Sequence, residues 1–264
     1  MEKIMKKNTS DITGLILDFG GTIDTNGQHW GKMLWHSYQQ EGMPVSEDAF
    51  REAYVHGERT FEKNPLVRAD YTLKRTIDVK LRLELEQLCI LGAWDADEKE
   101  LKRMHQQLTN RVYEHVSTII YRNRIVLEKL HHRYPLVMVT NFYGNMRQVL
   151  KEFQLDDLFE DVIESAVVNI RKPDARLFKM ALDVLQMPAA NVLAVGDSFY
   201  KDIEPASAIG CQTAWLKGEG WTDKQYDETL PTYILSDFQA YMTKMCLFYS
   251  HSLLCDKIEH TQGD

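Results

Sequence analysis

The sequence is poor in cysteine, in long apolar runs and in excess positive charge, and each absence excludes a class of protein. Its four cysteines lie far apart in 264 residues and form no CxxC pair, so they indicate reduced thiols rather than a zinc site or a disulfide framework. No apolar run reaches membrane-spanning length, and the first 14 residues lack the apolar stretch of a signal peptide. We therefore expect a cytoplasmic protein that does not enter a membrane.

The charge balance narrows the possible partners. A formal net charge of −8 disfavours broad contact with a nucleic-acid backbone or with an anionic membrane surface, although a local positive pocket could still bind a small anion. Hydrophobic residues make up 44% of the chain and charged residues 27%, which is typical of a globular protein with a sizeable core. We expect a small-molecule ligand, and neither repeats nor low-complexity tracts suggest otherwise.

Short apolar runs alternate with helical patterns through most of the chain. Continuous apolarity over a few residues indicates strands covered on both faces, as in a parallel sheet, and the runs occupy 15–17, 136–141, 191–198 and 212–216. Helical spacing of apolar residues appears between them, for example over 146–153 and 177–185. The alternation predicts a doubly wound, Rossmann-like α/β core, in which ligands bind beyond the carboxyl ends of the strands.

One long segment lacks strand signals. Residues 28–118 show helical periodicity without a clear strand, which predicts a helical cap inserted into an α/β core made of residues 1–27 and 119–240. Residues 241–264 form a C-terminal extension with the spacing of an amphipathic helix. The sequence leaves open whether this extension packs on the core or on a partner.

Chemistry-bearing residues follow the predicted strands. Two or three carboxylates that meet at one edge of a sheet repel each other unless a cation lies among them, and hard oxygen ligands favour Mg²⁺. A lysine at that edge would add a fixed positive charge, and hydroxyl or amide groups would hold phosphate oxygens. The candidates are Asp18, Thr140, Asn141, Lys172, Asp197 and Asp202.

Taken together, these motifs resemble the haloacid dehalogenase superfamily, whose common members are Mg²⁺-dependent phosphohydrolases. The resemblance covers residues 12 to about 238. The first motif appears here as Asp18-Phe19-Gly20-Gly21-Thr22, and the later motifs appear at Thr140, at Lys172 within RKPDARLF, and at Asp197 and Asp202 within GDSFYKD. The order and spacing of four motifs make the resemblance specific.

The resemblance implies a role for each matching residue. Asp18 would be the nucleophile that forms an aspartyl-phosphate, and Lys172 with Thr140 and Asn141 would bind the phosphoryl group. Asp18, Asp197 and the Gly20 carbonyl would hold Mg²⁺, with Thr22 and Asp202 in support. These implied roles predict a hydrolase of small phosphorylated metabolites.

Gly20 departs from the family pattern, which has a second aspartate at this position. That aspartate protonates the leaving oxygen and later activates water, so its absence removes acid–base catalysis worth roughly 10²- to 10⁴-fold in rate. Nearby ionisable residues that match no family motif are Asp24, His29, His36 and Lys63.

Two other classes remain open at this stage. One is a protein that binds phosphate or a partner without turnover. The other is a hydrolase of carbon–halogen or carbon–phosphorus bonds, because family members with those activities also lack the second aspartate; the phosphonate-cleaving members usually carry alanine there and a lysine from the insertion. The physiological substrate and the oligomeric state are not predicted.

Overall fold

The computed structural model describes residues 11–246, which build a parallel sheet flanked by helices. The residues described form a six-stranded sheet in the order β3-β2-β1-β4-β5-β6, with every neighbouring pair parallel. The strand bounds are β1 Gly14–Leu17, β2 Leu136–Thr140, β3 Asp161–Glu164, β4 Val192–Gly196, β5 Gln212–Leu216 and β6 Tyr233–Leu235. The prediction of a parallel α/β core is confirmed, and β3 and β6 are the strands that the sequence pattern missed.

Helices connect all consecutive strands except β5 and β6, which are joined by a loop. The long helices lie between β1 and β2: α1 Trp30–Gln40, α2 Glu47–Lys63, α3 Leu73–Ile90 and α4 Glu98–His131. The remaining helical elements are α5 Met146–Glu152, η1 Asp156–Leu158, α6 Ser165–Val168, α7 Arg176–Leu185, η2 Ala189–Asn191, η3 Phe199–Ile203 and α8 Glu204–Ala208. None of the helices in the described part of the chain is long and apolar enough to cross a membrane.

The sheet is covered on both faces, as continuous apolar strands require. Successive side chains of β1 point to opposite faces, so Leu15 and Leu17 join one apolar cluster while Ile16 joins the other. The first cluster includes residues of α4, α5 and the helical segment 238–246. The second includes Leu177 and Phe178 of α7.

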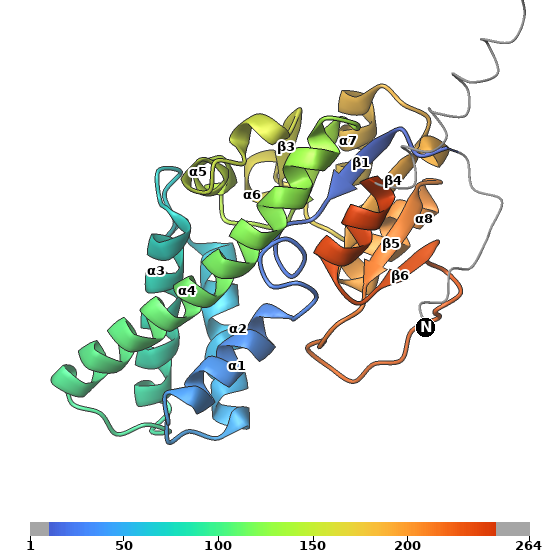
Figure 1. Ribbon diagram of the computed structural model, residues 1–264. Helices are drawn as coiled ribbons and strands as arrows, with labels where there is room; N and C mark the ends of the chain where they lie inside the picture. The colour runs from blue at the N-terminus through green and yellow to red at the C-terminus, as the bar shows by residue number, and fades with distance from the viewer. Residues whose placement is uncertain (1–10, 247–264) are drawn as a thin grey trace, which may run out of the picture.

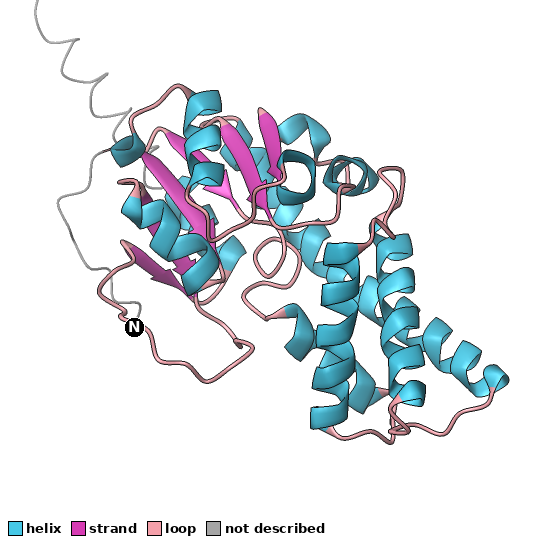
Figure 2. Cartoon of the chain, turned by 180° about the vertical axis from the view of Figure 1, so that it is seen from behind, coloured by secondary structure: helices cyan, strands magenta, loops and turns pink. Residues whose placement is uncertain are grey.

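Helices α1–α3 and the first half of α4 form a bundle beside the carboxyl ends of the strands (Figures 1 and 2). The sequence explains where these helices begin, because side chains of His29, Ser46, Thr72 and Asp97 each accept a backbone N–H at the helix start. Helix α4 continues without a break through residue 118, where we had expected the insertion to end. The division of the chain into core and cap therefore stays a prediction.

The described part of the C-terminal extension packs on the rest of the chain. Residues 238–246 are helical, and Phe238 and Met242 are fully buried in the larger apolar cluster. Of the two arrangements left open, these residues adopt the one that packs on the core. Residues 247–264 lie outside the described residues, as do residues 1–10.

Candidate active site

Strand β1 delivers Asp18 to the middle of the sheet's carboxyl edge. The strand is buried along its whole length between β2 and β4, and the backbone N–H of Asp18 donates to the Val195 carbonyl at 3.0 Å. The Asp18 side chain is therefore held at the end of the sheet pairing, with only 5% of the residue exposed.

The Lys172 ammonium uses each of its three donors inside the protein. It donates to Asp18 Oδ1 at 2.6 Å, to Asp202 Oδ1 at 2.6 Å and to the Val139 carbonyl at 3.1 Å. Burial alone would lower the pKa of Lys172, but the adjacent Asp18 and Asp202 carboxylates outweigh burial and raise that pKa. The amine therefore remains charged.

Asn141 fixes the backbone that carries Lys172. Its amide oxygen accepts from the Lys172 N–H at 2.9 Å, and its amide N–H donates to the Lys172 carbonyl at 3.1 Å. These paired bonds connect the end of β2 with the segment before α7. Asn141 thus lies where we expected it, with its side chain engaged by Lys172, while contact with substrate remains a prediction.

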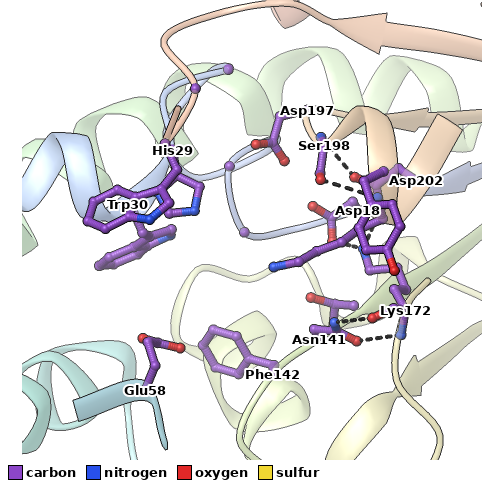
Figure 3. Close-up of a pocket in the computed structure, with 18 of the residues that line it drawn as sticks. Asp18, His29, Trp30, Glu58, Asn141, Phe142, Lys172, Asp197, Ser198 and Asp202 are labelled. Atoms are coloured by element: carbon purple, nitrogen blue, oxygen red, sulfur yellow. Dashed lines mark hydrogen bonds and ion pairs between the residues drawn. The ribbon is translucent and has the colours of Figure 1, made fainter. Parts of the chain in front are cut away.

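Asp197 and Asp202 come from the turn that follows β4. Asp202 lies in the π-helical turn η3, and its second carboxylate oxygen accepts from the Ser198 N–H at 3.0 Å. The Asp197 backbone N–H donates to the Thr22 hydroxyl at 3.1 Å. That hydroxyl lies 3.2 Å from Asp18 Oδ2 and 3.5 Å from Asp197 Oδ1, so Thr22 connects the first and last motifs. Figure 3 shows Asp197, Ser198 and Asp202 on the same side of the pocket as Asp18.

The three carboxylates suit a hard divalent cation. One oxygen from each of Asp18, Asp197 and Asp202 lies within 4.8 Å of the others, and Lys172 is the ammonium paired with two of them. Burial is the largest cause that raises the pKa of Asp18 to about 6, and the Asp202 charge adds to it. Burial and the charges of Asp202 and Asp18 raise the pKa of Asp197 well above its ordinary value. This surplus of negative charge and the oxygen donors fit Mg²⁺.

Thr140 carries an unpartnered polar atom at the same edge. The residue is 1% exposed, and its Oγ1 has no hydrogen-bond partner among the described residues. Buried hydroxyls are normally satisfied, so an orphaned one that lines a pocket indicates a ligand oxygen.

The structure requires glycine at position 21 but not at position 20. Gly21 has φ +96°, and a Cβ there would lie 2.3 Å from Asp197 Oδ1, so only glycine fits. Gly20 lies outside the left-handed region, and the nearest atom to a Cβ at this position is Trp30 Nε1 at 3.9 Å. The fold therefore leaves room for a side chain at position 20.

Asp24, the first carboxylate after Gly20 in the sequence, does not take the place of a carboxylate at position 20 in this structure. Asp24 is fully buried and accepts from the Gly21 N–H and from Trp30 Nε1, both at 2.7 Å. Burial is the main cause that raises the pKa of Asp24 to about 7. Both Asp24 oxygens are engaged and the residue does not line the pocket. Asp24 therefore stabilises the loop that contains Gly21.

The other ionisable residues that we singled out lie in different places. His29 lines the pocket, and burial, followed by the charge of Lys201, lowers its pKa to about 3. Its Nδ1 accepts from the Gly31 N–H, so the neutral ring carries its proton on Nε2. His36 is adjacent to Gln28 and Glu219, whereas Lys63 lines a separate groove on α2.

A pocket of about 380 Å³ opens over these residues. Its far side consists of residues that the sequence pattern did not single out, among them Glu58 on α2, Lys80 on α3, Tyr143 after β2 and Trp221 after β5. Of the aromatic residues at the start of the insertion, Trp30 lines the pocket, whereas Tyr38 is fully buried. Lys80 carried a signal in the sequence, since it interrupts the apolar face marked by Ile77, Leu81 and Leu85.

The fold and the site together define a hydrolase of the haloacid dehalogenase type. Residues 15–216 match the family model described as haloacid dehalogenase-like hydrolase, so the chain belongs to this family. The recognition made from the four motifs is confirmed.

Individual relatives agree with this assignment over different parts of the chain. A glyceraldehyde 3-phosphate phosphatase of Pyrococcus abyssi is 34% identical over 93 residues, which is 35% of this chain and 39% of that protein. A phosphoglycolate phosphatase of Aliivibrio fischeri is 30% identical over 172 residues, which is 61% of this chain and 75% of that protein. The chain thus spans well under half of the first relative and three quarters of the second.

Solved structures show the same fold. The putative HAD-hydrolase YfnB from Bacillus subtilis, solved bound to magnesium, superimposes with a TM-score of 0.54 at 18% identity, covering 88% of this chain and 97% of that chain. At this identity the likeness shows the fold alone.

Proposed function

We propose that the protein is a Mg²⁺-dependent phosphohydrolase that acts on a small phosphorylated metabolite through Asp18. The observation that carries the proposal is the Asp18 carboxylate, buried at the sheet edge, 2.6 Å from the Lys172 ammonium and grouped with Asp197 and Asp202. The phosphatase names of the two relatives support the same reaction class.

Each site residue would have a separate role in phosphoryl transfer. An Asp18 oxygen attacks phosphorus, and the bond to the leaving oxygen breaks with its electron pair going to that oxygen. Water then attacks the aspartyl-phosphate at phosphorus and frees Asp18. Thr140 Oγ1 would hold a phosphoryl oxygen, and Lys172 keeps Asp18 ionised and aimed.

The oxygen donors at this edge would hold the metal. We assign Asp18, Asp197 and the Gly20 carbonyl as ligands, because the Asp202 oxygens are already engaged by Lys172 and by the Ser198 N–H. Bound Mg²⁺ would supply positive charge to the nucleophile and to the phosphoryl oxygens.

Gly20 predicts a strong dependence on the leaving group. Without a proton donor at position 20, a leaving oxygen departs as an anion, so acyl and aryl phosphates should react much faster than sugar phosphates. Slow attack of water would also let phosphorylated protein accumulate.

The test is a screen of phosphate esters, acyl phosphates, phosphonates and haloacids with wild type and Asp18→Asn, with and without Mg²⁺. We expect Mg²⁺-dependent phosphate release that Asp18→Asn abolishes, together with a phosphorylated wild-type species in intact-protein mass spectrometry. If no compound is turned over while Mg²⁺ and phosphate still bind, the chain is a binding protein. Halide release without Mg²⁺ would instead assign it to the dehalogenases.

Lys80 favours one second candidate, hydrolysis of a carbon–phosphorus bond. This amine lines the pocket from α3, pairs with Glu58, and lies 4.8 Å from the Tyr54 ring centroid. Burial is the largest cause that lowers the pKa of Lys80 to about 8, which leaves a fraction of neutral amine at neutral pH. A neutral amine condenses with a carbonyl by loss of water, and the resulting iminium accepts the electron pair of a breaking carbon–phosphorus bond, so no acid at position 20 is required.

This second candidate has its own signature in the same screen. Only a phosphonate with a carbonyl group beside the carbon–phosphorus linkage would be turned over, and borohydride reduction would attach it to Lys80. Lys80→Met would abolish that labelling and leave the turnover of phosphate esters in place.

A further inference from the structure

The missing side chain at position 20 leaves an indole ring facing the space it would occupy. Trp30 Nε1 is the nearest atom to a Cβ built on Gly20, at 3.9 Å. The Trp30 N–H donates to Asp24 at 2.7 Å, and this bond to a fully buried carboxylate fixes the plane of the indole. A group that leaves from phosphorus on the side of residue 20 therefore departs beside a rigid aromatic surface.

A second aromatic surface faces the same space. Phe142 follows β2 two residues after Thr140 and lines the pocket. Its ring packs edge-on against Phe19, with centroids 5.9 Å apart, and lies tilted against Tyr143, with centroids 4.9 Å apart. Figure 3 shows Trp30 and Phe142 on different walls of the opening that faces Asp18 and Lys172. Two fixed rings on separate walls suit a flat group better than a branched or polyhydroxylated one.

The end of this space away from Asp18 is polar. Glu58 lies near Phe142 there, on the side opposite Asp18 (Figure 3). Its carboxylate accepts from the Tyr143 hydroxyl at 3.2 Å and pairs with Lys80. The Glu58 side chain is 29% exposed, so it retains acceptor capacity for a donor on a ligand.

We propose that the substrate is an aryl phosphate, whose ring occupies the space between Trp30 and Phe142 and whose ring substituent donates a hydrogen bond to Glu58. The inference rests on the proposed phosphohydrolase function and names its substrate class. A phenolic oxygen leaves as a stabilised anion, so this class needs no proton donor at Gly20. Contacts with Trp30 and Phe142 would then favour an aromatic leaving group over an acyl leaving group of similar acidity.

The first experiment separates aromatic shape from leaving-group acidity. Wild-type kcat/KM is measured with Mg²⁺ for aryl phosphates and for fluorinated alkyl phosphates whose parent alcohols have matched pKa values. We expect at least a tenfold preference for the aryl member of each pair, expressed mainly in KM. Equal kcat/KM values for the two members of a pair would overturn the proposed aromatic subsite without contradicting the proposed phosphohydrolase function. Absence of Asp18-dependent turnover for all phosphate compounds, acetyl phosphate included, overturns the proposed function itself.

The second experiment uses variants of Glu58 and Glu62, which lie on one face of α2, and of Phe142, which follows β2. Glu58→Gln should raise KM about tenfold for 4-hydroxyphenyl phosphate and leave KM for phenyl phosphate within twofold. Glu62→Gln, one turn further along α2 and paired with Arg171 at the surface, is the matched control and should change neither value. Phe142→Leu should raise KM for both aryl esters while turnover of acetyl phosphate reports that the variant is folded. Equal effects of Glu58→Gln on the two aryl esters would overturn the assigned contact.

Discussion

Gly20 occupies a position where the backbone accepts any residue, in contrast to Gly21 beside it. A left-handed φ and the proximity of Asp197 require glycine at position 21, whereas a Cβ at position 20 meets nothing closer than 3.9 Å. At the scale of single residues, the fold therefore does not require glycine at position 20, and we propose that the absence of a carboxylate there reflects the chemistry of the site.

Gly20→Asp tests this interpretation directly. The new carboxylate has room beside Trp30, and we expect hydrolysis of alkyl phosphates to rise by about 10²-fold, with a much smaller change for aryl phosphates, because only poor leaving groups need the proton. Leaving-group series measured for both proteins provide the comparison, and Gly20→Asn, which has the same shape without the acid, is the control. Unchanged alkyl rates in a folded Gly20→Asp protein would mean that another group already supplies the proton.

The sequence predicted which residues meet at the carboxyl edge of the sheet, but not which residues form the opposite wall of the pocket. Asp18, Lys172, Asp197 and Asp202 follow strands or precede helices in a fixed order, and parallel strands bring such positions to one edge. Glu58 and Trp221 belong to segments that meet only through tertiary packing, so no local spacing connects them. Strands β3 and β6 were missed because neither shows a continuous apolar run of useful length: β3 has two apolar residues between acidic ones, and β6 has only three residues.

At the scale of elements, the loop after β5 reaches across to the inserted helices through Trp221. The Trp221 ring centroid lies 4.9 Å from that of Tyr54 and 5.2 Å from that of His29, and the Arg51 guanidinium lies 4.2 Å above the ring. Both terminal nitrogens of Arg51 also donate to the Trp221 carbonyl at 3.3 Å. These contacts close one side of the pocket by joining an element of the sheet to α2.

Trp221→Ala should release this contact. The aromatic and cation–π interactions together contribute about 2 kcal/mol, so hydrogen exchange in 217–232 and at the start of α1 should accelerate roughly 30-fold. Exchange measured by mass spectrometry checks the expectation, with Asp223→Ala in the same loop as control. Unaltered exchange at both segments would show that backbone bonds such as His29 N–H to the Glu219 carbonyl hold the loop without the indole.

At the scale of the whole molecule, the buried carboxylate cluster lowers the stability of the folded state. The chain carries a net charge of −8, and the pKa of Asp197 is raised by burial and by the charges of Asp202 and Asp18. A raised folded-state pKa means that near neutral pH, above the unfolded pKa of 3.8, the ionised side chain costs stability. If Mg²⁺ binds the folded state alone, as we propose, it would offset this cost by mass action.

Asp197→Asn should therefore change stability in opposite directions with and without metal. In EDTA at pH 7.5 the variant should melt at a higher temperature than wild type, because a disfavoured charge is gone. With Mg²⁺ at 100 times its Kd, wild type should instead melt at the higher temperature, because binding raises its free energy of unfolding by about 2.7 kcal/mol. Differential scanning fluorimetry measures both, and Asp157→Asn on the surface should follow wild type in each buffer. A wild-type melting temperature insensitive to Mg²⁺ would contradict the assigned metal site.

Helix α4 connects the helical bundle directly to the sheet. Its 34 residues form one uninterrupted helix, about 51 Å long at 1.5 Å per residue, that packs on α3 in its first half and buries Val126, Leu127 and Leu130 near the sheet in its second. The connection from the bundle to the half of α4 near the sheet therefore contains no loop, so any movement of the bundle relative to the sheet would have to bend α4 or turn about it. We expect that a molecule bound to the exposed side of α4 around Tyr121 and Ile125 would restrict such movement without contacting Asp18, Asp197 or Asp202.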